Sequence, residues 1–457
     1  MKPFEENNIK YLALELPDDI KHYKYNGNFD GELSAIERYL SHDVSEAMKI
    51  RLFLETVIAQ NMKNDYKNNF DDLLAALVEK HPKINAENLE EIINLGHVDY
   101  ILKSGERYFQ NSAASNIVKC CGAYIYRIEN GRDEQPCPNE LLHKVVNEMQ
   151  EKGSMAYRFE IFEKIAPKKE FVREGKTLRA YLPYPCACQE QDSSRIKLLS
   201  SSHNIKISNA PQRTAFFEEI CNADTEFSVS FSYVNKATYH ELSASEVLSE
   251  QPGFYTDEQY PHIIFTPFLR SLAKDIAGNE KNPLLVAKRV YDYITKNVKY
   301  SYMRAYLLID NIPQSAALNN RGDCGVQALL FITLCRILGI PARWQSGSSV
   351  ELDSIGSHDW AQLFVAPYGW LPVDPSYGGG AFRNGDMVLH SHYFGNLDPY
   401  RLIACTEFQS PFEPAKHYLR TDPYDNQSGE IEYSDRELFF GEYKASRMVL
   451  GYSKLKV

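Results

Sequence analysis

The chain has 457 residues, 44% of them hydrophobic, 24% charged and 12% aromatic, and this length predicts two to four domains. The formal net charge of −11 and the lack of basic clusters argue against nucleic acid as a partner. No stretch approaches the ~18 apolar residues that a membrane helix needs, and the N-terminal sequence lacks the apolar run of a signal peptide. We therefore expect a cytoplasmic protein with no membrane partner. The sequence leaves the oligomeric state open.

Residues 1–155 are predicted to form a helical domain. In 46–63 apolar residues recur at helical spacing, and the same pattern returns in three later segments of this region. Residues 156–255 differ, because short segments such as 177–185 and 226–235 alternate apolar with polar residues between turn-forming clusters. This texture predicts a small antiparallel β-sandwich.

Residues 256–400 return to helical patterns and then contain two strand-like segments. Thr266 and Asn282 are plausible N-caps, and a proline follows each of them at the first helical position. The remaining region, 401–457, is rich in strand patterns. We expect this C-terminal extension to pack on the core or on the sandwich.

The nine cysteines are odd in number and irregularly spaced, which argues against a disulfide framework. Cys186 and Cys188 form a C-x-C pair, and Cys120 is adjacent to Cys121, but neither pair has a second pair at zinc-finger spacing. Buried structural thiols are therefore favoured over a metal site.

Cys324 differs from the other cysteines because it follows Gly322-Asp323 and begins a long apolar run that ends before Gly339. Asp323 is a good N-cap, which places Cys324 in the first turn of a buried helix. The positive end of the helix dipole is expected to lower the pKa of this thiol and to favour the reactive thiolate. Cys324 is therefore the candidate nucleophile.

A base and an orienting group follow further along the chain. His358 precedes the strand-like WAQLFV, and Asp374 ends the strand-like GWLPVD. If the loop between the strands is Ala366–Tyr368, Trp360 opposes Asp374, and His358 is a diagonal neighbour of Asp374 on the same face. A two-residue loop would place them on opposite faces. Each residue alone is more often a turn or packing residue, but together they predict a catalytic triad.

These residues resemble the transglutaminase-like superfamily, which has a papain-type fold. The resemblance is specific over about 319–376 and, more narrowly, is to bacterial transglutaminase-like cysteine proteases. It implies a papain-type core, and the β segment resembles the sandwich that precedes such cores in some bacterial members. With the all-α N-terminal domain expected from the helical pattern, we predict an α+β protein. The motifs that carry the resemblance are Gly322-Asp323-Cys324, Gly339-Ile340-Pro341-Ala342-Arg343, His358-x-Trp360, Gly369-Trp370 and Asp374-Pro375.

The resemblance implies a cysteine-dependent amide hydrolase that works through Cys324, His358 and Asp374 and a thioester acyl-enzyme, with no metal or organic cofactor. The substrate would be a peptide or protein, attacked at a peptide bond or a Gln side chain. A transglutaminase or deamidase would use the same residues, with an amine or water as the acceptor. A non-catalytic binding protein on the same scaffold is the third alternative. The triad itself does not separate these reactions.

The oxyanion donor is less defined by the sequence. The backbone N–H of Cys324 is the first candidate, and Tyr300 or Tyr302 is the second, since transglutaminase-like folds often take an aromatic donor from an earlier strand or loop. Gln314 lies ten residues before the nucleophile. Trp360 is expected to pack beside the site or to form a wall for the substrate.

Two further features are noted as weaker candidates. The segment 346–357 separates the nucleophile helix from the base and is either a lid or an ordinary surface loop. His390 and His392 would share one face of a strand, as metal ligands can, but no third ligand is evident.

Overall fold

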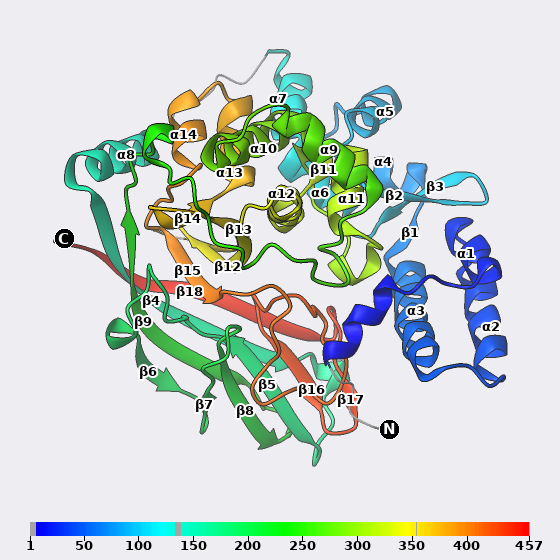
Figure 1. Cartoon of the computed structure of the whole chain (residues 1–457). Coiled ribbons are helices and arrows are strands. Elements are labelled where there is room, and N and C mark those ends of the chain that lie inside the picture. Colours follow the sequence, from blue (N-terminus) through cyan, green and yellow to red (C-terminus); the bar gives the residue numbers. More distant parts are fainter. Residues whose placement is uncertain (1–5, 133–138, 353, 457) are drawn as a thin grey trace.

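The computed structural model describes residues 6–132, 139–352 and 354–456 (Figure 1). The chain is of the α+β class, as predicted. The helices of the papain-type core surround one central helix, α12, and the β-sandwich lies below them in Figure 1 with the N-terminal helices to the side.

The N-terminal region is helical, as predicted, but a small sheet is inserted into it. The sheet has the order β1–β3–β2, and its strands are only three to five residues long, too short to give a clear alternating pattern in the sequence. The elements of the N-terminal region are a 3-10 helix Glu6–Ala13, α1 Asp18–Tyr25, α2 Phe29–Leu40, α3 Glu46–Asp65, β1 Tyr66–Asn68, α4 Phe70–Val78, α5 Ala86–Asn94, β2 Tyr100–Lys103, β3 Glu106–Gln110, α6 Ala113–Cys120, α7 Gly122–Asn130 and α8 Glu140–Lys152.

The sandwich consists of a five-stranded sheet, β17–β16–β5–β8–β7, and a four-stranded sheet, β18–β4–β9–β6. The last strand of the chain, β18, lies beside β4 and runs along the sandwich below the core (Figure 1). The C-terminal extension thus supplies strands to both sheets. The strands are β4 Ser154–Pro167, β5 Thr177–Pro183, β6 Lys197–Ser201, β7 Lys206–Ile207, β8 Thr214–Ile220, β9 Phe227–Thr238, β16 Glu430–Tyr433, β17 Arg436–Glu437 and β18 Tyr443–Leu455.

The core packs α12 between a four-stranded antiparallel sheet, β14–β13–β12–β15, and the helices α9, α10 and α11. Its helices begin where the sequence predicts: Thr266 and Asn282 accept hydrogen bonds from their first turns, and each precedes a proline. The elements are α9 Pro267–Ala277, α10 Pro283–Asn297, β10 Lys299–Tyr300, α11 Ile312–Asn319, β11 Arg321–Gly322, α12 Cys324–Ile337, β12 Ala342–Val350, β13 Ile355–Val365, β14 Gly369–Val373, α13 Pro375–Arg383, α14 Met387–His392 and β15 Arg401–Cys405.

The β13–β14 hairpin has the predicted register. Val365 opposes Gly369 and Ala361 opposes Val373, so the loop is Ala366–Tyr368 and has odd length. The segment 346–357 is not a simple loop, because most of it belongs to the antiparallel pair β12 and β13.

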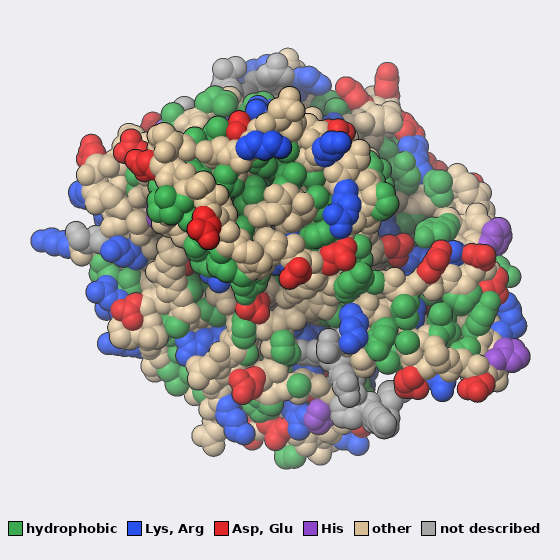
Figure 2. Space-filling view, in the orientation of Figure 1, with side chains coloured by type: hydrophobic (Ala, Val, Ile, Leu, Met, Phe, Trp, Pro, Cys, Tyr) green, Lys and Arg blue, Asp and Glu red, His purple; other side chains and the backbone are tan. Residues whose placement is uncertain are grey.

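Three findings concern the remaining sequence expectations. The eight described cysteines are free thiols, and Cys137 lies outside the described residues. Among the helices of the described chain, none is long and apolar enough to cross a membrane, and the cytoplasmic location stays a prediction. Figure 2 shows Lys and Arg side chains interspersed with Asp and Glu over the visible face.

Candidate active site

Cys324 is the first residue of α12, and Asp323 caps the helix by accepting a hydrogen bond from the Val326 N–H at 3.1 Å. The parallel pair β10–β11 places Tyr300 opposite Gly322, just before the nucleophile. Cys324 is 8% exposed, and its Sγ donates to Oδ2 of Asp359 at 3.4 Å. The thiol therefore lies at the start of a buried helix and beside the strand that carries His358.

The pKa of the Cys324 thiol is raised well above its ordinary value, mainly by burial and also by the negative charges of Asp359 and Asp323. The sequence had predicted the opposite direction from the helix dipole. The partial charge at a helix end is worth only about 1 kcal/mol, and the loss of water around a buried thiolate costs more. In this state the thiol is held neutral.

His358 and Asp374 form a buried pair. Nε2 of His358 lies 2.7 Å from Oδ2 of Asp374, and the two side chains are 5% and 0% exposed. Arg401 donates to the same carboxylate oxygen at 3.0 Å. Burial acts to raise the pKa of Asp374, but the charges of His358 and Arg401 outweigh it and lower this pKa to about 2. Asp374 is thus ionised and fixes the imidazole through Nε2, which leaves Nδ1 for another partner.

The strand β13 presents His358 and Asp359 to opposite sides, because consecutive strand residues alternate. Asp359 faces the Cys324 thiol, and His358 packs on Tyr377 of α13 with ring centroids 4.5 Å apart. Within the described chain, no hydrogen bond joins Cys324 to His358. The structure brings His358 and Asp374 together. Cys324 contacts the next residue of the strand, Asp359, and so lies on the opposite side of β13 from His358.

The cleft beside Cys324 has a volume of about 240 Å³ and an acidic lining. Asp323, Asp359, Asp422 and Asp425 contribute carboxyl groups, and the side chain of Gln427 donates to Oδ1 of Asp359. Burial raises the pKa of each of these carboxyl groups, and that of Asp323 reaches about 6. Local sequence gave no sign of Asp425 and Gln427, which lie about a hundred residues after the nucleophile. Asp359, in contrast, is the middle residue of the His358-x-Trp360 motif, so the sequence did point to its neighbourhood.

The two tyrosines named as oxyanion candidates, Tyr300 and Tyr302, line this cleft together with Cys324. Burial raises the pKa of both hydroxyl groups, so each is a neutral O–H that can donate a hydrogen bond. Their rings make an edge-to-face contact with centroids 5.7 Å apart.

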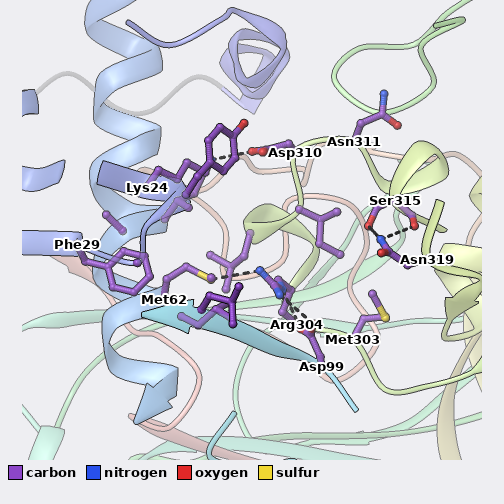
Figure 3. Close-up of a pocket in the computed structure, with 18 of the residues that line it drawn as sticks. Lys24, Phe29, Met62, Asp99, Met303, Arg304, Asp310, Asn311, Ser315 and Asn319 are labelled. Atoms are coloured by element: carbon purple, nitrogen blue, oxygen red, sulfur yellow. Dashed lines mark hydrogen bonds and ion pairs between the residues drawn. The ribbon is translucent and has the colours of Figure 1, made fainter. Parts of the chain in front are cut away.

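Gln314 lies elsewhere, in a cavity of about 610 Å³ between the N-terminal helices and the core (Figure 3). Phe29 and Met62 form one side of this cavity, and Ser315 and Asn319 of α11 form the other. Met303 and Arg304 line both this cavity and the cleft, so a wall only a few residues thick separates the two. Gln314 is therefore not beside Cys324.

Trp360 is fully buried and packs next to the base rather than in the cleft. Its Nε1 donates to Oε1 of Gln345 at 2.6 Å, and its ring lies 5.8 Å from that of His358. Its indole thus supports His358 from the side away from Cys324 and offers no surface to a substrate in this state.

His390 and His392 lie on the short helix α14, not on a strand as the metal interpretation assumed. Residues at i and i+2 of a helix do not share a face. Among the described residues, no group of three or more His, Cys, Asp or Glu side chains could hold a metal ion.

Comparison with known proteins gives a family match over the part of the chain that contains Cys324, His358 and Asp374. Residues 270–375 match the transglutaminase-like superfamily. An uncharacterized protein of Bacillus subtilis (strain 168), YebA, is 25% identical over 129 residues, which are 24% of this chain. The match spans 17% of that relative, so the chain covers less than a fifth of its length.

Two solved structures match parts of this chain at low sequence identity. A cysteine protease candidate from Cytophaga hutchinsonii is 16% identical, with a TM-score of 0.43 over 66% of this chain and 92% of the other. The periplasmic domain of TgpA from Pseudomonas aeruginosa is 12% identical, with a TM-score of 0.27 over 54% of this chain and 95% of that domain.

Proposed function

We propose, from the transglutaminase-like domain that residues 270–375 form, that this protein is a cysteine-dependent amide hydrolase acting on peptides or proteins. The observation that carries the proposal is the buried hydrogen bond between His358 Nε2 and Asp374 Oδ2, on a strand whose next residue bonds the Cys324 thiol. The residue after the base thus contacts the candidate nucleophile, and the base itself is held by its orienting carboxylate on the other side of the same strand.

In the proposed mechanism, Nδ1 of His358 takes the proton of the Cys324 thiol. The thiolate attacks the amide carbonyl carbon, a C–S bond forms, and the imidazolium returns the proton to the leaving nitrogen as the C–N bond breaks. Water then attacks the thioester with His358 as the base, which releases the acid and restores the thiol. Asp374 keeps the imidazole in one tautomer throughout. In this state His358 and Cys324 lie on opposite sides of β13, so the proposed transfer requires a rearrangement on substrate binding that brings Nδ1 to the thiol.

The carbonyl oxygen of the substrate becomes negatively charged during this attack. We assign its stabilisation to the backbone N–H of Cys324 and to the hydroxyl of Tyr300. The first belongs to the unpaired N–H groups at the start of α12. The second lines the same cleft and is neutral.

The test is hydrolysis of a peptide library by the wild-type protein, Cys324→Ala and His358→Ala, followed by mass spectrometry. We expect each substitution to lower the rate by about 10⁴-fold. Cys221→Ala is the matched control, since Cys221 is a free thiol in the core of the sandwich, does not line the cleft and is expected to leave the rate unchanged. Full activity in Cys324→Ala, or no cleavage of any amide by the wild type, would contradict the proposal.

Transfer of a Gln acyl group to an amine is the second candidate, because the carboxyl groups of the cleft suit a cationic amine. It is tested by adding a labelled amine to the same reactions. Incorporation of the label into substrate in place of hydrolysis would favour the transferase. Binding of a peptide without any turnover by the wild type would favour the third alternative, a non-catalytic binding protein.

A further inference from the structure

The lining of the cleft at Cys324 is acidic, and the basic groups near it are held by other partners. Arg304 is the one basic residue among the described residues that line it, and this guanidinium is held by Asp99 through bonds of 2.8 and 2.9 Å. Arg420 reduces the repulsion at Asp422 and Asp425 but is itself paired with Glu430 at 2.9 Å. Arg304 and Arg420 are therefore engaged by Asp99 and Glu430 and offset only part of the negative charge of the carboxyl groups in the cleft.

One of these carboxyl groups is also short of a hydrogen-bond donor. Asp425 is 3% exposed and lines the cleft, and among the described residues its Oδ2 has no hydrogen-bond partner. Asp359 uses its two oxygens on the Cys324 thiol and on Gln427, and the neighbours that act on Asp425 most directly are Asp359 itself and the Ser346 hydroxyl, neither of which carries positive charge. An unsatisfied buried carboxyl oxygen is costly, and a donor that carries positive charge would relieve that cost.

We infer that the cleft recognises a positively charged group, an ammonium or a guanidinium, which the substrate places against Asp425 and Asp359 beside Cys324. The inference rests on the proposed function for the identity of the cleft as the substrate site. The volume of about 240 Å³ accommodates such a group together with the reacting amide. A cation there would form charge-assisted hydrogen bonds, which are the stronger kind.

Recognition of a cation would also change the nucleophile. The negative charges of Asp359 and Asp323 contribute to the high pKa of the Cys324 thiol. A bound ammonium opposes those charges, so it lowers this pKa and favours the thiolate. The thiol would then remain neutral in the empty cleft and become reactive when the correct substrate is bound.

The test compares two thiol reagents of opposite charge and needs no turnover. A cationic reagent, 2-aminoethyl methanethiosulfonate, and an anionic one, 2-sulfonatoethyl methanethiosulfonate, react alike: the thiolate forms a disulfide and displaces methanesulfinate. The rate at Cys324 is followed by mass spectrometry of the peptide that contains it. We expect the cationic reagent to react about tenfold faster, after correction for the rates with a free thiol.

Variants show whether the preference comes from the cleft. Asp425→Asn and Asp422→Asn are expected to reduce the ratio of the two rates, and the second serves if the first fails to fold. Asp435→Asn is the matched control, because Asp435 is an exposed carboxylate paired with Arg173 and Lys176 outside the cleft. Equal rates in the wild type, or a ratio that falls as much in the control, would overturn the inference. Either result leaves the hydrolase test above unaffected.

Protection experiments identify which molecule carries the charge. Butylamine is compared with butanol, and a blocked Ala-Lys-Ala peptide is compared with its norleucine analogue, each as a competitor of the reaction at Cys324. Protection by the lysine peptide alone places the cation on the peptide substrate. Protection by butylamine as well shows that the cleft also admits a free amine. Protection by neither cationic competitor would overturn the inference.

Discussion

The buried carboxyl group of Asp99 lies on one side of the segment that contains Met303 and Arg304, and those of Asp359 and Asp425 lie on the other. The pKa of Asp99 is lowered, whereas the pKa values of Asp359 and Asp425 are raised. On the side of the N-terminal helices, Asp99 accepts bonds from Arg304, from Arg321 at 2.8 Å and from the Tyr66 hydroxyl at 2.5 Å (Figure 3). Burial opposes its ionisation, but the two guanidinium groups outweigh burial and lower its pKa. Asp99 is therefore a charged anchor that joins the N-terminal region to the core.

On the other side of the same segment, Asp359 and Asp425 face each other without such partners. Burial raises the pKa of both groups. The charge of Asp425 raises the pKa of Asp359 further, whereas the interaction with Asp359 lowers that of Asp425. A buried carboxylate with a structural role normally has a cationic partner, as Asp99 has in Arg304 and Arg321. This difference is consistent with a stabilising role for Asp99 and with the proposed binding of a cation at Asp359 and Asp425.

The largest effect on the hydrolysis rate is expected at another buried carboxylate, Asp374. It is paired with a cation, as Asp99 is, but it orients the proposed base His358. Asp374→Asn keeps the shape and removes the charge that fixes His358, so we expect the hydrolysis rate to fall by about 10⁴-fold. The rate of peptide hydrolysis measures this, with Asp435→Asn as the control for loss of one carboxylate. A fall of tenfold or less would place Asp374 with the purely structural group.

Removing the anchor tests the other half of the comparison. Asp99→Asn leaves Arg304 and Arg321 buried without their counter-charge, so we expect the free energy of unfolding to fall by about 3 kcal/mol. Urea denaturation at neutral pH measures this change. The matched control is Asp310→Asn, which removes a half-exposed partner of Lys24 in the same cavity and is expected to cost less than about 1 kcal/mol. Equal losses in the two variants would show that Asp99 is no anchor.

The sequence predicts those parts of this site that depend on local pattern. The cap Asp323, the start of α12 and the register that sets His358 diagonal to Asp374 each follow from a few neighbouring residues. The same hairpin register also directs Asp359 toward the nucleophile, so this residue was open to prediction from strand alternation.

Other parts depend on contacts that no local pattern encodes. Asp425 and Gln427 reach the cleft from a region without regular elements, between β15 and β16. The direction of the Cys324 pKa depends on how much water the surrounding chain excludes, which a helix start alone does not reveal. The short sheet β1–β3–β2 likewise has too few residues per strand to outweigh the helical pattern around it.

The smallest predicted effect is the change in unfolding free energy of Asp425→Asn, which differs from that of Asp99→Asn in its sign and its pH dependence. Because the pKa of Asp425 is raised in the folded state, ionising it costs stability, and this cost is absent at low pH and grows as the pH rises from about 4. Asp425→Asn should therefore have a higher free energy of unfolding than the wild type at pH 8 and an equal one near pH 4. Asp99, whose pKa is lowered, contributes stability that is present above about pH 4 and is lost as the pH falls, so the loss in Asp99→Asn should shrink on acidification. Urea denaturation of both variants across this range gives the two curves. A destabilised Asp425→Asn at pH 8 would mean that its carboxylate is compensated after all, and the electrostatic contrast between the two groups would fail.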